Sequence, residues 1–439
     1  MKTNALLITI AGSLAASSAH ADLLAIRVGR AETISKGVIE HAVVFVENGK
    51  IVTIGEDLPI ERGIPVIDKP DWVVMPGFVN SYSRMGCDSE GSDDMSPEIK
   101  CSDELWPGAD DYAEVIKYGV TTLGLYPAGN GIPGQAVAVR TKAKTKAEMI
   151  LKDPAYLKII LRADSSSKKR IADGFKKADD YNEKVKKARE KWDKDQEKKG
   201  SKKTEEKKPE EKPEEKKGGM AEDPKPEDAK TDKKDSGFVP PEPEPKTKPF
   251  VDLRNGSLHA LVSITSAAEY LHWLDALGKE TITFDLRCVL SRDSDLFYVK
   301  SKKDYDLDED GIGDKKLRVV IEPLLTLEPS TMRTRNLAME FSNAGAKIVF
   351  IPRNDTMTDH KNWLAAVGEI VGAGLKRDIA LRAMTLEPAE MLGVGDRVGS
   401  LEKGKDANMV FLNGDPFQPS TRIQAVMLDG KFVFGEVNQ

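Results

Sequence analysis

Short apolar segments that suit β-strands alternate with helical patterns through the middle of this 439-residue chain, and this alternation constrains the fold most. Strands that alternate with helices build parallel sheets from βα units. Eight such strands are the number that a (β/α)₈ barrel needs. We therefore predict an α/β fold with a TIM-like barrel over residues 73–394, whose strands lie at 73–79, 121–126, 136–140, 157–162, 260–265, 281–290, 317–322 and 347–352.

Both ends of the chain are rich in strand patterns. Near the N-terminus, Asn48-Gly49 separates two β-branched runs, which is a strong hairpin signal. The C-terminal residues repeat the pattern, with turns at Asn413-Gly414-Asp415 and Asp429-Gly430. We predict that residues 22–72 and 395–439 meet in one small β-sandwich.

A charged insertion occupies residues 165–249 within the predicted barrel. Its first part, to about residue 199, carries apolar residues three and four positions apart, which predicts an amphipathic helix. The rest consists of Lys, Glu and Pro repeats that bury too little apolar surface to order, so we predict a disordered linker. Two roles stay open, a docking tail for a partner and a solvated spacer. The helical stripe consists of Ile171, Phe175, Ala178, Tyr181, Val185, Ala188 and Trp192.

The first 21 residues have the pattern of a cleaved secretory signal. Lys2 precedes a short apolar run, and Ala19-His20-Ala21 offers small residues for cleavage. The alternative is a buried N-terminal helix. We expect a secreted or periplasmic protein that does not span the membrane, and the net charge of −6 gives no support for nucleic-acid binding.

Three cysteines are present. In an oxidising compartment Cys87 and Cys101 would bridge a loop of moderate length and leave Cys288 free. The alternative is a pair of reduced, partly buried thiols.

Five segments carry a family resemblance, and the first of them, residues 24–55, is similar to the opening strands of the amidohydrolase superfamily. Met75–Arg84 (MPGFVNSYSR) is similar to the first-strand signature of the amidohydrolase superfamily, Pro-Gly-x-x-Asp-x-His-x-His. Residues 119–122 resemble its second strand, residues 380–393 its helix after the last strand, and residues 398–408 its return to the sandwich. The resemblance is greatest to exported members similar to imidazolonepropionase. It implies a metal-dependent hydrolase of non-peptide carbon–nitrogen bonds.

The residues depart from that family's metal site. Tyr82 and Arg84 stand where the family has histidines, and Asn80 stands where it has aspartate. A guanidinium has no acceptor atom and repels cations. The chain has only five histidines, and none follows a predicted strand directly; Asp355, after the eighth strand, is the one candidate remnant of the family's catalytic aspartate. We therefore do not expect catalytic zinc, iron or manganese.

Two interpretations of the altered site stay open. In the first, Tyr82, Arg84 and Arg353 bind a small anionic ligand at the barrel mouth, because guanidinium groups favour carboxylates and phosphates. In the second, Arg84 pairs with Asp355 and replaces the charge of the metal with a salt bridge.

An acidic loop precedes the seventh predicted strand. Asp306, Asp308, Asp310 and Asp314 occupy relative positions 1, 3, 5 and 9, with Gly311 at 6 and the carbonyl of Ile312 at 7. This spacing resembles calcium loops, although Leu317 replaces the glutamate of an EF-hand. Two interpretations stay open, a structural calcium site and an acidic turn without an ion.

These observations favour an exported protein related to amidohydrolases that is a non-catalytic pseudoenzyme with a binding or structural role. One alternative is a hydrolase with an unconventional metal site. Another is an interaction module that uses the charged insertion, with a protein of the cell envelope as its partner.

Overall fold

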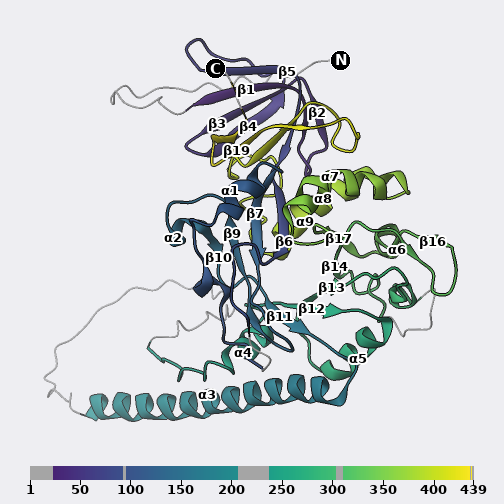
Figure 1. The fold of residues 1–439 in the computed structure, drawn as a ribbon. Coiled ribbons are helices and arrows are strands. Elements are labelled where there is room, and N and C mark those ends of the chain that lie inside the picture. The colour runs from purple at the N-terminus through teal and green to yellow at the C-terminus, as the bar shows by residue number, and fades with distance from the viewer. Residues whose placement is uncertain (1–22, 92–94, 206–236, 303–309, 436, 438–439) are drawn as a thin grey trace, which may run out of the picture.

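The computed structural model describes residues 23–91, 95–205, 237–302, 310–435 and 437. Both chain ends lie in one region at the top of Figure 1, and a mixed α/β body lies below it. The predicted signal segment falls outside the described residues. Within the part of the chain that the structure describes, no helix is both long and apolar enough to cross a membrane.

The chain ends form one eight-stranded sheet in the order β20-β19-β18-β5-β1-β3-β4, with β2 beside β1. The Asn48-Gly49 hairpin is confirmed, since both residues have positive φ and join β3 to β4. The two ends therefore meet as predicted, in hydrogen bonding that makes a single sheet. Its strands are β1 (Leu24–Glu32), β2 (Val38–Glu40), β3 (Ala42–Glu47), β4 (Lys50–Glu56), β5 (Val66–Pro76), β18 (Met409–Leu412), β19 (Ile423–Leu428) and β20 (Lys431–Phe434).

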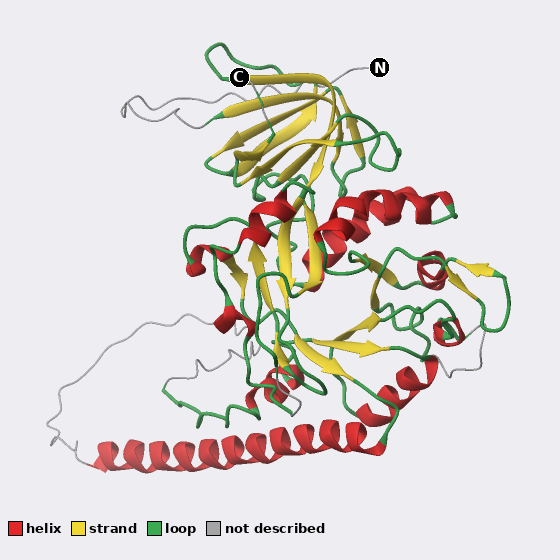
Figure 2. Cartoon of the chain, in the orientation of Figure 1, coloured by secondary structure: helices red, strands yellow, loops and turns green. Residues whose placement is uncertain are grey.

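Each of the eight strand segments predicted for the body contains a strand, yet the hydrogen bonding describes two open sheets (Figure 2). One has the order β10-β9-β7-β6 and the other β17-β14-β13-β12-β11-β8. The strands are β6 (Phe78–Ser83), β7 (Val120–Leu125), β8 (Gly134–Gln135), β9 (Val137–Arg140), β10 (Ile150–Lys152), β11 (Leu157–Ile160), β12 (Ala260–Ile264), β13 (Phe284–Cys288), β14 (Arg318–Ile321) and β17 (Lys347–Phe350).

The segment that contains β8 and β9 joins these sheets and runs against its neighbours. Its first half pairs antiparallel with β11 and its second half pairs antiparallel with β7. Only residues 126–133 separate β7 from β8, too few for the crossover that parallel strands need. The expectation of eight parallel strands is therefore wrong at the third position.

The first predicted strand, 73–79, is also wrong in its bounds, because the chain leaves one sheet there and enters the other. Residues up to Pro76 pair with β18 in the chain-end sheet, and β6 begins at Phe78 beside β7. At the bend, a Cβ on Gly77 would lie 2.2 Å from the Thr121 hydroxyl oxygen. Only glycine allows the two strands to approach this closely.

The two sheets of the body face a common interior. One cluster of buried side chains joins Val79 of β6, Ala138 of β9, Leu261 of β12, Val320 of β14 and Val349 of β17. Most of the interior therefore packs as an apolar core. Helices and short elements surround it: η1 (Cys101–Glu104), α1 (Asp110–Ile116), α2 (Lys146–Met149), α4 (Lys248–Arg254), α5 (Ala267–Leu277), η2 (Leu296–Val299), β15 (Thr326–Leu327), β16 (Thr334–Arg335), α6 (Leu337–Ala344), α7 (Met357–Gly372), α8 (Arg377–Met384) and α9 (Leu386–Met391).

Helix α3 (Ser165–Glu205) confirms the amphipathic pattern and lies along the bottom of Figure 1. Its first turns are part of the body, since Ile171, Phe175 and Ala178 are buried in the main core. Further along, the Tyr181 hydroxyl donates to the carbonyl of Pro241 at 2.9 Å. The residues after 237 therefore pack back onto the helix, and the remainder of the predicted linker, 206–236, lies outside the described residues.

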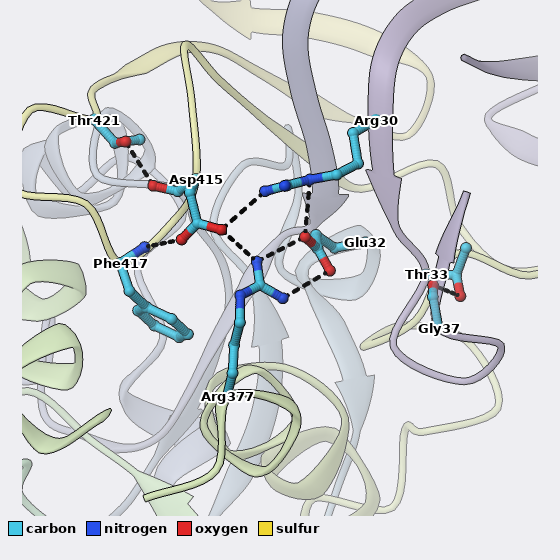
Figure 3. A network of polar contacts seen from close by, with 8 residues as sticks. All are labelled: Arg30, Glu32, Thr33, Gly37, Arg377, Asp415, Phe417 and Thr421. Atoms are coloured by element: carbon cyan, nitrogen blue, oxygen red, sulfur yellow. Dashed lines mark hydrogen bonds and ion pairs between the residues drawn. The ribbon is translucent and has the colours of Figure 1, made fainter. Parts of the chain in front are cut away.

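A network of ion pairs joins the chain-end sheet to the body (Figure 3). Arg377 of α8 donates to both carboxylate oxygens of Glu32 on β1, at 2.7 and 3.2 Å. It also pairs with Asp415 at 3.0 Å, and Arg30 contacts both acids at 3.0 to 3.1 Å. Two cations and two carboxylates thus balance where the two parts meet.

Candidate functional site

Asp355 lies where the loops after β6 and β17 come together. Its carboxylate accepts hydrogen bonds from the Ser83 hydroxyl at 2.9 Å and from the main-chain N–H of Arg84 at 2.5 Å. These contacts place Asp355, the predicted remnant of the family's catalytic aspartate, beside the Met75–Arg84 motif. They also correct the predicted salt bridge, because Arg84 donates to Asp355 through its main chain and uses its guanidinium elsewhere.

The Arg84 guanidinium binds main-chain carbonyls. It donates to Tyr126 at 3.2 Å, to Cys87 at 3.1 Å and to Ser89 at 2.9 Å. Arg353 is exposed and has no hydrogen bond or ion pair among the described residues. The structure therefore does not bring Tyr82, Arg84 and Arg353 together as one anion-binding group, and Arg84 ties the loop after β6 to the end of β7.

His360 of α7 was not predicted as part of the site, but its side chain is buried against β6. Its Nδ1 lies 2.8 Å from the Thr356 carbonyl, and its Nε2 lies 3.2 Å from the Asn80 amide nitrogen. The Asn80 oxygen accepts from the main chain of Tyr82, which orients the amide. A carbonyl only accepts, so Nδ1 carries the proton and Nε2 accepts from Asn80. His360 thus links α7 to β6, and its Nε2 also lies 3.9 Å from the Asp355 carboxylate.

Lys158 of β11 occupies the interior beneath these loops. The Tyr82 and Tyr126 rings stack with centroids 3.9 Å apart, and the Lys158 ammonium lies 3.7 Å from the centre of the Tyr126 ring. Lys158 is only 4% exposed, and among the described residues its ammonium has neither a hydrogen bond nor an ion pair. Cation–π contact supplies part of the solvation that burial removes, but no opposite charge.

Arg287 of β13 lies on the other side of Tyr82, with its guanidinium carbon 5.3 Å from the ring centre. It forms a buried ion pair with Glu322, which follows β14, and donates to the carbonyls of Cys288 at 2.6 Å and Val320 at 3.3 Å. Glu322 therefore neutralises Arg287, whereas neither the Lys158 ammonium nor the Arg84 guanidinium has a carboxylate partner among the described residues.

These charges shift the titration of the site. Burial, together with the nearby guanidinium groups of Arg84 and Arg287, lowers the pKa of Lys158 to about 7. Burial raises the pKa of Tyr82 and of Tyr126 above the usual range. Near neutral pH the tyrosines are protonated, while Lys158 exists in both forms.

Lys158, Arg287 and Glu322 escaped sequence reasoning, although a signal was present. Each is a charged residue in or directly after a strand that is otherwise apolar and buried. Side chains alternate between the two faces of a strand, so a residue and those two positions before and after it lie on the same face. A charged residue in such a strand therefore lies on a buried face together with apolar residues.

The residues do not fit the metal site that the family resemblance implies. Lys158, Arg287 and the neutral tyrosines occupy the interior, and a cation there would be repelled. Among the described residues, the one group of three His, Cys, Asp or Glu ligand atoms close enough to hold an ion is Cys87, Cys101 and Glu104, which lies in the loops.

The predicted calcium loop is described only in its second half; Asp306 and Asp308 lie outside the described residues. Asp310 pairs with Lys315 at 2.7 Å, and the Ile312 carbonyl accepts from the main chain of Leu317 at 3.2 Å. Asp314 accepts from the main chain of Lys302 at 2.6 Å. These candidate ligands already have protein partners, and calcium binding stays a prediction.

Cys87 and Cys101, the two residues of the predicted disulfide, lie close together. Their sulfur atoms lie 3.6 Å apart, and both residues are buried free thiols here, as is Cys288. The bridge stays a prediction.

Known proteins with a similar sequence or fold are amidohydrolases and prolidases. The sequence model of the Amidohydrolase family matches residues 334–433, from β16 to β20. A crystal structure of an amidohydrolase from Thermotoga maritima is 20% identical, with a TM-score of 0.70, over 94% of this chain and 100% of that one. A prolidase solved with N-methylphosphonate-L-proline is 13% identical, with a TM-score of 0.51, over 94% of this chain and 100% of that one. No curated protein matches the chain.

Proposed function

We propose that the chain is a non-catalytic member of the amidohydrolase superfamily that binds a small anion at Lys158; the family match over residues 334–433 and the similar fold of a solved amidohydrolase support this relationship. The observation that carries this proposal is a buried ammonium with no carboxylate partner at the strand ends. An ion taken from water without an opposite charge is costly. A ligand carboxylate or phosphate would supply that charge where the family binds metal.

The chemistry of the neighbours suits such a ligand. Lys158 and Arg84 give the surroundings a positive potential, since Glu322 neutralises Arg287, and the protonated Tyr82 and Tyr126 hydroxyls are donors. Asp355, in the loop after β17, already accepts hydrogen bonds from Ser83 and Arg84. Its negative charge would therefore repel an anion bound at Lys158 only weakly.

Ligand screening tests the proposal. Inorganic phosphate and small mono- and dicarboxylic acids would be added to the purified protein in thermal-shift and calorimetric titrations. We expect at least one to stabilise the wild type and to lose tenfold or more in affinity in Lys158→Met. Arg353→Ala is the matched control and should bind as the wild type does. Equal binding by wild type and Lys158→Met would overturn the proposal.

The alternative is hydrolysis through an unconventional metal at Asp355. Elemental analysis of the wild type and Asp355→Asn separates the two functions. Stoichiometric zinc, iron or manganese that disappears in Asp355→Asn, together with hydrolysis of a carbon–nitrogen bond, would favour the enzyme. We expect Asp355→Asn to leave the metal content unchanged.

The relationship to this family also supports the finer architecture that we propose. The strand order β6, β7, β9/β8, β11, β12, β13, β14, β17 follows a (β/α)₈ barrel with its third strand reversed. The contacts of Asn80 with His360 and of Ser83 with Asp355 bring its two ends together. We likewise assign the chain-end sheet to the small β-sandwich of the family.

Export and a role for the charged insertion are further parts of the proposal. Cell fractionation and N-terminal sequencing test export, with a mature protein beginning at Asp22 as the expected result. Because the segment after residue 237 packs on α3, a deletion that tests docking should be confined to residues 206–236. Retention of an envelope partner by that variant would exclude docking through the deleted residues.

A further inference from the structure

We propose that Cys87, Cys101 and Glu104 form a zinc site, separate from the interior site at Lys158. Cys87 belongs to the loop after β6, and the other two residues are the ends of η1. Their three ligand atoms lie within 4.8 Å of one another. The site would therefore tie the loop that carries Arg84 to a neighbouring element.

The distance between the thiols suits a metal. The sulfur atoms are 3.6 Å apart. Two sulfurs on one tetrahedral zinc ion, each at about 2.3 Å from it, are roughly 3.8 Å apart. A disulfide needs a separation of about 2.05 Å. With a carboxylate oxygen of Glu104 as the third ligand, a tetrahedral zinc ion would keep its fourth position open.

Two buried polar atoms at the site have no partner. Glu104 Oε2 is buried without a hydrogen bond, while its Oε1 accepts from the Ser89 hydroxyl at 2.7 Å. The hydroxyl of Tyr112, on α1, is also buried and unpartnered. It lies close to the loop, since a Cβ on Gly86 would be 2.6 Å from it. Unpaired buried oxygen atoms are costly, and a cation would satisfy a carboxylate oxygen.

The charges balance with zinc present. Two thiolates and one carboxylate bring three negative charges, and Zn²⁺ leaves one. The Arg84 guanidinium, which donates to the carbonyls of Cys87 and Ser89, supplies the remaining positive charge. Arg84 would thus stabilise a zinc site in the neighbouring loop. This site is not the family's metal site, in which a histidine stands at the position of Arg84.

Zinc titration of the reduced full-length chain, stripped beforehand with a chelator, tests the proposal. We expect one Zn²⁺ per chain, at least tenfold weaker binding in Glu104→Gln, and no binding in Cys101→Ser. Cys288→Ser, which removes a distant buried thiol, should bind normally. Cobalt should give a thiolate charge-transfer band that Cys101→Ser lacks.

Two results would overturn the proposal. One is equal zinc binding by wild type and Cys101→Ser. The other is a reduced wild type that takes up no zinc, whether or not mass spectrometry finds a Cys87–Cys101 disulfide in protein isolated without reductant. If Cys101→Ser does not fold, as judged by circular dichroism, Glu104→Gln decides, because undiminished binding there excludes the carboxylate ligand.

Discussion

The two ends of the interior differ in how their charges are paired. Where the strands begin, Arg318 contacts Glu390 at 2.8 Å, Glu387 at 3.4 Å and Asp285 at 3.9 Å. Lys347 reaches both glutamates at 3.5 Å. Where the strands end, Lys158 has no carboxylate. Each charge named at the first end has an opposite charge beside it, whereas the Lys158 ammonium at the other end has none, and this difference underlies the proposal that an anion binds there.

Replacement of Glu322 should change the stability of the protein most. Glu322→Gln leaves the Arg287 guanidinium buried without a carboxylate, which should cost about 3–5 kcal/mol of unfolding free energy. Chemical denaturation measures it. The double variant Arg287→Met/Glu322→Leu removes both charges and should recover most of the loss; a single variant within 1 kcal/mol of the wild type would show that the pair is not buried as described.

The next largest effect is the change of stability with pH that the buried Lys158 ammonium causes. Its pKa falls from 10.5 in the unfolded chain to about 7 in the folded one, so the unfolded state binds more protons between these values. Wild-type stability should therefore rise from about pH 7 to above pH 10, by up to roughly 5 kcal/mol.

Lys158→Met lacks this contribution and serves as the reference for it. The variant should be the more stable protein near pH 7, and its advantage should shrink as the pH rises. Denaturation of both proteins at several pH values measures the difference, and a constant difference across that range would contradict the burial of an unpaired ammonium.

The charged cluster where the strands begin should lose less stability when one acid is removed than the Arg287–Glu322 pair does. Glu387→Gln removes a buried carboxylate, but Glu390 and Asp285 still face Arg318, so we expect a loss of about 1–3 kcal/mol. Anion binding should be unchanged, because this cluster lies at the opposite ends of the strands. A weaker anion response in a folded Glu387→Gln variant would remove the distinction between the two ends.

Arg353→Ala should have the smallest effect. The side chain is exposed and has no partner among the described residues, so its stability and its anion binding should stay within about 0.5 kcal/mol of the wild type. A large loss of binding would restore the sequence-based prediction that Arg353 contacts the ligand.

Much of the fold could be predicted because strand patterns are local. The hairpin at Asn48-Gly49 and the eight apolar segments needed only residue types and spacing. The break at Gly77 and the reversed third strand depend on which strands become neighbours. The short connection over residues 126–133 contained that information, but a count of eight strands did not use it.

The site was predictable only in part. The absence of histidines at the predicted strand ends does not point to the charges that occupy the interior instead, those of Lys158, Arg287 and Glu322. Lys158 lies between Leu157 and Ile159 in a buried strand, where alternation alone indicates an inward charge. Its lack of a partner is a three-dimensional fact that no single sequence reveals.

The titration of Lys158 tests the central claim most directly. NMR of the isotopically labelled lysine side chains, with the Lys158→Met spectrum to assign the signal, would give its pKa with and without a bound anion. The account predicts a pKa near 7 in the free protein that rises when phosphate or a carboxylate binds, because an opposite charge favours the ammonium. A pKa near 10.5 that no anion changes would contradict it.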